Sequence, residues 1–65
     1  MGDEKIFKAV AANIAYSITR GVRFFYRDDP EFIELKCTHE ITQLFLEMDD
    51  RLIIDSSHAR PPLMN

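Results

Sequence analysis

The stretch FFYRDDPEF, residues 24–32, decides between two folds. Two phenylalanines and a tyrosine followed by a polar turn are typical of a strand that enters a hairpin. Asp29-Pro30-Glu31 is equally typical of a helix start, with Asp29 as the N-cap and Pro30 at the first helical position. The periodicity of the apolar residues on each side of this stretch distinguishes the two folds.

The residues that lead into this stretch follow a helical period. Apolar or small residues recur every three or four positions and share one side of a helical wheel, and the opposite side is polar. The stripe consists of Phe7, Val10, Ala11, Ile14, Ile18, Gly21, Val22 and Phe25. Because its phase continues through Gly21, we predict one helix over residues 3–27.

The residues that follow the stretch form a second stripe of the same kind. It consists of Ile33, Cys37, Ile41, Leu44, Met48 and Leu52. We therefore predict a turn at residues 28–29, a helix over residues 30–55 and a flexible tail over residues 56–65, where serines and prolines end the order. The predicted fold class is all-α, a two-helix antiparallel hairpin that forms a single domain over residues 1–65.

An α+β fold of order αββα is the alternative. Residues 16–27 are rich in β-branched and aromatic side chains, and Arg20-Gly21 is a suitable helix C-terminus. In this fold, residues 22–27 pair with residues 32–38 across a turn at residues 28–31, and Thr38 caps the last helix. Both folds remain open at this point.

The chain needs more apolar burial than one hairpin provides. At 65 residues a domain is only marginally stable alone, although 46% of the residues are hydrophobic. Leu35, Leu46 and Ile53 lie away from the main stripe of the second helix, and Ile6, Phe32 and Ile54 add to this surplus. We predict that two hairpins associate into a four-helix-bundle homodimer, which buries these side chains.

The sequence carries no catalytic, cofactor or metal signature. Cys37 is the only cysteine, and His39 and His58 are far apart, so a zinc site and a disulfide are not expected. Cys37 lies in the apolar stripe, where we expect a buried thiol. A single cysteine indicates a reducing, cytoplasmic setting, and no apolar run is long enough to span a membrane. We predict that the protein is not an enzyme.

Charge divides the chain into two halves. Residues 3–27 carry five basic and two acidic side chains, whereas residues 28–55 carry two basic and nine acidic ones. Glu47, Asp49 and Asp50 lie near the C-terminal end of the predicted second helix, where the helix dipole favours cations. Acids at that end indicate a role in recognition. We predict that these acids, with Leu35, Leu46 and Ile53, bind a protein partner.

Nucleic-acid binding is the second functional hypothesis. Arg20, Arg23 and Arg27 share one face of the predicted first helix and are candidates for contacts with phosphates. The net charge of −3 and the acidic second half disfavour a nucleic-acid partner. The leading prediction is a small acidic protein-interaction or regulatory module.

Residues 47–53, EMDDRLI, resemble a conserved segment of the small aspartyl-phosphate phosphatases that fold as bacterial helical hairpins. Asp50 aligns with the aspartate of that family. Residues 46–49 differ from the serine, glutamine, glutamate and leucine that precede it. The resemblance implies phosphatase-type regulation, the third hypothesis, and we do not carry the catalytic activity over to this chain.

Overall fold

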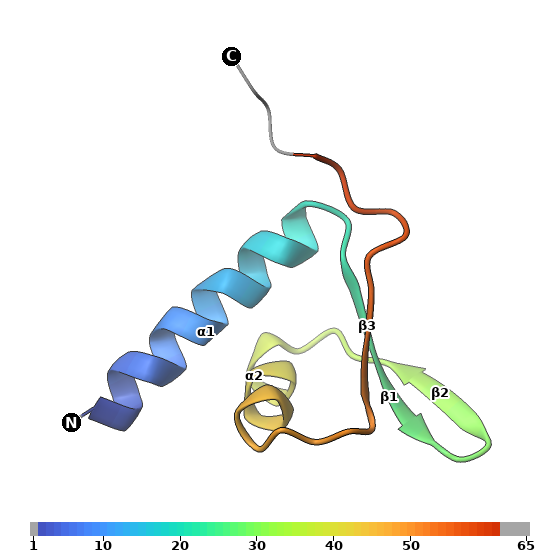
Figure 1. The fold of residues 1–65 in the computed structure, drawn as a ribbon, viewed down its shortest axis with the longest axis horizontal. Helices are drawn as coiled ribbons and strands as arrows, with labels where there is room; N and C mark the ends of the chain where they lie inside the picture. The colour runs from blue at the N-terminus through green and yellow to red at the C-terminus, as the bar shows by residue number, and fades with distance from the viewer. Residues whose placement is uncertain (1, 62–65) are drawn as a thin grey trace.

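Two helices and a three-stranded antiparallel sheet form the fold. The structure is a computed structural model, and it describes residues 2–61. The elements follow in the order α1 (Gly2–Thr19), β1 (Arg23–Asp28), β2 (Glu31–Glu34), α2 (Thr38–Leu46) and β3 (Leu52–Asp55). The strand order is β2-β1-β3, so β1 is central and the last strand pairs with the first (Figure 1). The fold class is α+β.

The stretch FFYRDDPEF forms a β-hairpin, so the predicted all-α hairpin is wrong. Asp28 pairs with Glu31, and Asp29 and Pro30, joined by a cis peptide bond, form the turn between β1 and β2. Asp29 is therefore not an N-cap. The αββα alternative has these two strands right and lacks β3.

The predicted helix over residues 3–27 ends at Thr19. The N–H of Val22 donates to the C=O of Ser17 at 2.9 Å, and the N–H of Gly21 donates to the C=O of Ile18 at 2.9 Å. These bonds form a Schellman C-cap, in which Gly21 has a φ of 92°. A position in the left-handed region of φ favours glycine. This explains why α1 stops here although the apolar period continues.

The predicted helix over residues 30–55 is replaced by β2, a short α2 and β3. The N-cap of α2 is Cys37 rather than Thr38, and Cys37 is exposed rather than buried. A second Schellman motif ends α2: Met48 and Asp49 donate their N–H groups to the C=O of Phe45 and of Leu44, each at 3.1 Å. The chain then turns into β3.

A small core joins the helices to one face of the sheet. Ile14 of α1, Phe24 of β1 and Ile41 of α2 are buried, and Val10, Val22, Leu35 and Leu52 pack around them. We call the face of the sheet that carries Phe24 the inner face. Directly paired residues share a face, so Tyr26, Ile33, Leu52 and Ile54 also belong to the inner face. The opposite, outer face carries Phe25, Phe32 and Ile53.

The molecule is less compact than its length predicts. Its Cα radius of gyration is 12.7 Å, whereas a compact domain of this length has about 10.7 Å. In Figure 1, α2 lies between α1 and the sheet, so α1 does not pack flat against the strands. The predicted four-helix bundle of two helical hairpins is also wrong, because β1, β2 and β3 replace the end of the first predicted helix and much of the second.

The segment after β3 returns to the end of α1. The N–H of Arg60 donates to the C=O of Arg20 at 2.7 Å, and the guanidinium of Arg20 donates to the C=O of Arg60 at 2.9 and 3.0 Å. The prediction of a flexible tail over residues 56–65 stays a prediction, and residues 62–65 lie outside the described residues. Within residues 2–61, no helix is long and apolar enough to cross a membrane.

Candidate functional site

The structure divides the residues that the sequence analysis assigned to partner binding. Leu46 is the last residue of α2, and Glu47, Asp49 and Asp50 follow it in the turn that leads to β3. These four lie together. Leu35 packs against the core, and Ile53 lies on the outer face of the sheet, so neither joins the acidic turn.

Asp49 has a structural task in this turn. Its carboxylate accepts hydrogen bonds from the backbone N–H of Arg51 at 3.0 Å and from the Arg51 side chain at 3.2 and 3.3 Å. These bonds, the backbone one first, hold the pKa of Asp49 below its ordinary value. The guanidinium of Arg51 also lies 4.9 Å from the centre of the Tyr26 ring. Asp49 therefore orders the turn, and Glu47 and Asp50 are the acids more exposed to a partner.

Beside the acidic turn lies an apolar groove between α1 and β3. It has a volume of about 600 Å³, and its apolar lining consists of Ile6 and Val10 of α1, Leu44, Phe45 and Leu46 of α2, Met48 of the turn, and Leu52 and Ile54 of β3. We call this site the α1–β3 groove. A second hollow of about 330 Å³ shares Val10, Phe45 and Ile54 with it and is lined by the core residues Ile14 and Phe24. The second hollow therefore lies between the groove and the core.

Five large apolar side chains of the groove are exposed to solvent. Their exposed fractions are 55% for Ile6, 46% for Phe45, 39% for Leu46, 89% for Met48 and 50% for Ile54. At roughly 200 Å² for a fully exposed large side chain, they expose on the order of 550 Å² together. This area is at the upper end of the largest apolar patch of a typical monomer, about 300–600 Å², and such patches are often binding sites.

Met48 adds a backbone signal to the groove. It has a φ of 54°, in the left-handed region, where glycine or asparagine is usual after a helix. A long apolar side chain at this position costs about 1 kcal/mol relative to glycine. Strained residues of this kind cluster at functional sites. Met48 is therefore a strained apolar residue that is also 89% exposed beside the groove.

The edge of β3 that faces away from β1 borders the same groove, and we call it the outer edge. The N–H of Arg27 donates to the C=O of Arg51 at 2.8 Å, so Arg51, Ile53 and Asp55 direct their backbone groups toward β1. Because these groups alternate along an antiparallel strand, those of Leu52 and Ile54 point to the outer edge. The N–H of Leu52 donates to the C=O of Asp49 at 3.1 Å. The C=O of Leu52 and both backbone groups of Ile54 remain directed at the edge.

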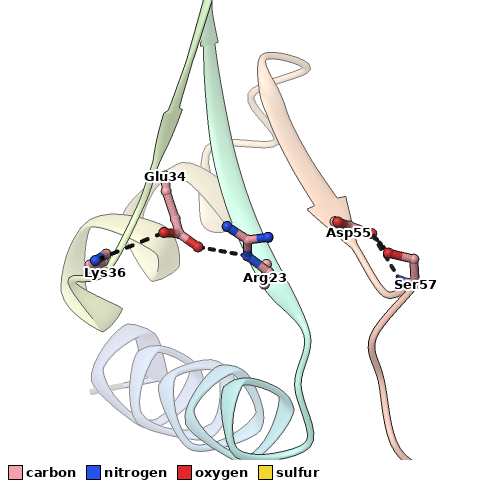
Figure 2. Close-up of polar contacts among 5 residues, drawn as sticks. All are labelled: Arg23, Glu34, Lys36, Asp55 and Ser57. Atoms are coloured by element: carbon pink, nitrogen blue, oxygen red, sulfur yellow. Dashed lines mark hydrogen bonds and ion pairs between the residues drawn. The ribbon is translucent and has the colours of Figure 1, made fainter.

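The three arginines proposed for phosphate contacts do not form one cluster. Arg20 lies at the end of α1 and binds the C=O of Arg60, whereas Arg23 and Arg27 lie on the outer face of β1. Arg23 donates to Glu34 at 2.8 Å, and Lys36 lies 4.0 Å from the same carboxylate (Figure 2). The hydrogen bond from Arg23 lowers the pKa of Glu34 and raises that of Arg23. Two of the three guanidinium groups are therefore already occupied.

Asp55 closes the other end of β3. Its carboxylate accepts hydrogen bonds from the hydroxyl of Ser57 at 2.6 Å and from the backbone N–H of Ser57 at 2.9 Å (Figure 2). These bonds lower the pKa of Asp55, and the charge of Arg23 acts in the same direction. Among residues 2–61, no group of three or more side chains could hold a metal ion.

Sequence reasoning found part of the groove. The surplus of Leu46, Ile6 and Ile54 was visible, because each falls outside the helical stripes. Phe45 was missed because it belongs to neither apolar stripe. Its signal was the three-residue apolar run Leu44-Phe45-Leu46, followed after Glu47 by Met48, which is too apolar for an exposed helix end.

Comparisons with protein-family models, with curated proteins and with solved structures found no match to this chain.

Proposed function

We propose that this protein is a small non-enzymatic interaction module that binds a protein segment in the α1–β3 groove. The observation that carries the proposal is the exposure of Ile6, Phe45, Met48 and Ile54 around one groove in a chain with a small core. Burying about 550 Å² of apolar surface is favourable by roughly 25 cal/mol per Å², before the costs of association. A protein is the partner that matches an apolar groove next to a strand edge.

The acidic turn supports this partner class. Glu47 and Asp50 border the groove next to Met48 and are exposed. Charges at the rim of an interface affect the rate of association and the choice of partner more than the affinity. We propose that the turn favours a partner surface with a basic residue beside its apolar anchor. The single, exposed Cys37 is consistent with a reducing, cytoplasmic setting.

Site-specific photocrosslinking in cells tests the proposal. A benzoyl-phenylalanine at position 45 or 48 would lie in the groove, and one at position 16 is the matched control. Tyr16 is an aromatic residue with 58% exposure, and it lines a separate hollow near Arg60. We expect a defined protein adduct from positions 45 and 48 and none from position 16. No adduct from either groove position, or equal adducts from all three, contradicts the proposal.

Phosphatase-type regulation loses its structural basis. Residues 47–51 of the segment that resembles the helical-hairpin phosphatases form a turn here, and only residues 52–53 continue into a strand. Asp50 therefore does not project from a helix as that resemblance implied.

A further inference from the structure

We infer that the occupant of the α1–β3 groove is a second copy of this chain, which pairs its β3 antiparallel with β3 about a two-fold axis. The inference rests on the proposed function and specifies its partner. The result is a continuous six-stranded sheet of order β2-β1-β3-β3-β1-β2. β3 is suited to this pairing because it is an edge strand within the described residues, and Figure 2 shows β1 between β2 and β3.

The sequence of β3 and its flank is complementary to itself. The run Arg51-Leu52-Ile53-Ile54-Asp55 has a cation at one end, three aliphatic residues and an anion at the other end. Antiparallel pairing centred on Ile53 places Arg51 opposite Asp55 of the second copy, twice by symmetry. The bonds to Asp49 and Ser57 within one chain leave Nη1 of Arg51 and Oδ2 of Asp55 for these pairs. Opposite charges across a strand pair stabilise it, and like charges destabilise it. A parallel arrangement would instead place like charges side by side.

The backbone groups fit the same register. With Ile53 opposite Ile53, residues 52 and 54 form the hydrogen-bonded pairs on each side of the axis. The N–H of Ile54 then donates to the C=O of Leu52 in the second copy, and both groups already point to the outer edge. Two intermolecular hydrogen bonds form without any change in the turn that holds the N–H of Leu52.

The side chains of the groove meet in this arrangement. Leu52 and Ile54 lie on the inner face, so those of both copies become neighbours beneath Phe45 and Ile6. The groove side chains expose about 550 Å² per chain, and the β3 backbone and flanking residues add to this area. A standard stable interface needs about 800 Å² per partner. The solvent-accessible surface is 5270 Å², against about 4300 Å² for a compact monomer of this mass. This difference agrees with a chain that has surface left to bury.

The other sheet edge does not offer the same fit. β2 has the sequence Glu31-Phe32-Ile33-Glu34, with an acid at each end. Antiparallel pairing of β2 with its copy would bring glutamates together, and charged residues are a common protection of edge strands. Of the two edges, only that of β3 has complementary ends and an adjacent apolar groove.

Disulfide trapping in the purified full chain tests the register. In a Cys37→Ser background, Ile53→Cys places two thiols across the axis in a non-hydrogen-bonded pair, where the Cα atoms are about 4.5 Å apart and can be bridged. Phe32→Cys is the matched control on the other edge, since Phe32 is 60% exposed. We expect most of the Ile53→Cys protein to oxidise to a dimer and little of the Phe32→Cys protein. Failure of Ile53→Cys to crosslink, or preferential crosslinking of Phe32→Cys, overturns the inference.

A charge exchange gives an independent readout in chains without an added cysteine. Arg51→Glu and Asp55→Lys each place like charges opposite one another in their own homodimers, whereas a mixture restores two attractive pairs. We expect heterodimers to bind at least about fivefold more tightly than either homodimer in sedimentation of labelled chains. If the two variants form homodimers and heterodimers in the proportions of random pairing, the antiparallel register is overturned. Circular dichroism of each variant confirms that it is folded.

The two proposals fail in different ways. In one outcome, the wild-type chain sediments at its mass of 7.6 kDa at all accessible concentrations, and position 45 photocrosslinks to a different protein. This outcome overturns the inference that the occupant is a second copy and agrees with the proposed interaction groove. A monomer with no crosslinks overturns both. Crosslinked species of twice the chain mass from positions 45 and 48 support both.

Discussion

At the residue scale, two positions with positive φ determine where the helices end. Gly21 ends α1 and Met48 ends α2, each in a Schellman motif. Glycine adopts this conformation without strain, and methionine does not. The two positions therefore have opposite expected responses to substitution.

Met48→Gly should stabilise the fold and weaken binding. Removing the left-handed side chain raises the free energy of unfolding by about 0.5–1 kcal/mol. The same change removes an 89% exposed apolar contact of the groove. Urea denaturation of a dilute sample measures the stability, and sedimentation measures association. Met48→Asn is the control, because asparagine also tolerates this φ. Stronger association of either variant contradicts the role given to Met48.

Gly21→Ala should destabilise the fold. A Cβ atom at Gly21 would lie 2.5 Å from the C=O oxygen of His58, at a φ of 92°. Because backbone atoms must shift to make room, we expect a loss of roughly 1–3 kcal/mol in thermal or urea unfolding. Gly2→Ala is the matched control, since a Cβ there meets nothing within 4 Å. Equal stabilities of the two variants would refute this account of the end of α1.

Asp49 should make stability depend on acid pH. Its pKa is lowered in the folded state by hydrogen bonds from Arg51. The stabilisation is therefore present above the unfolded pKa of about 3.9 and is lost as the pH falls below it through the folded pKa. We expect Asp49→Asn to show a smaller loss of stability than wild type between about pH 5 and pH 2. Asp50→Asn leaves the Asp49–Arg51 contacts in place and should behave as wild type.

At the element scale, the sequence predicted the start of the fold better than its second half. The body of α1 and the residue types of the hairpin were recognisable, but Val22 and Phe25 continue the helical spacing of α1 by coincidence. Val22 and Phe25 are three apart, so they would point to opposite faces of a strand. Ile33 and Cys37 in the second half are four apart, and a period of two and a period near 3.6 both place such residues on the same side. Gly21 correctly indicated the end of α1, but the continued apolar spacing beyond it led to the prediction of a longer helix.

The end of α2 was hidden for a different reason. A glycine usually marks a helix C-terminus, and here Met48 occupies the left-handed position. Without a glycine or proline between residues 38 and 55, the apolar stripe of α2 appeared to run on through Leu52. The candidate site follows the same division. The acids of the turn and the apolar surplus of Leu46, Ile6 and Ile54 were visible in the sequence, whereas the meeting of these residues around one groove depends on tertiary packing.

The hairpin places two phenylalanines in contrasting surroundings, which gives a matched pair of core tests. Phe24 on the inner face of β1 is 4% exposed, and Phe32 at the outer face of β2 is 60% exposed. Phe24→Ala should lose about 3–5 kcal/mol, enough to unfold a marginal domain, whereas Phe32→Ala should change stability by less than about 1 kcal/mol. Circular dichroism with urea titration measures both. Comparable losses would show that the inner face is not the core.

At the scale of the whole molecule, the central feature is a shortage of burial. Among the described residues, three buried hydrophobic residues form the core, with four partly buried ones packed around them. Five exposed apolar side chains line a groove beside a strand edge. Self-association through β3 would extend the sheet, cover the groove and double the core in one step. The same open edge would otherwise be available to other strands, which is a recognised route to aggregation.

Amide hydrogen exchange at Ile54, followed over a range of protein concentrations, tests the central claim most directly. The N–H of Ile54 points away from β1 and toward the outer edge of β3, so it is exposed to water in a single chain. If a second β3 occupies the edge, its exchange should slow by at least about tenfold as concentration rises, while Ile53, which already bonds to β1, changes less. A rate for Ile54 that stays fast and independent of concentration would contradict the pairing.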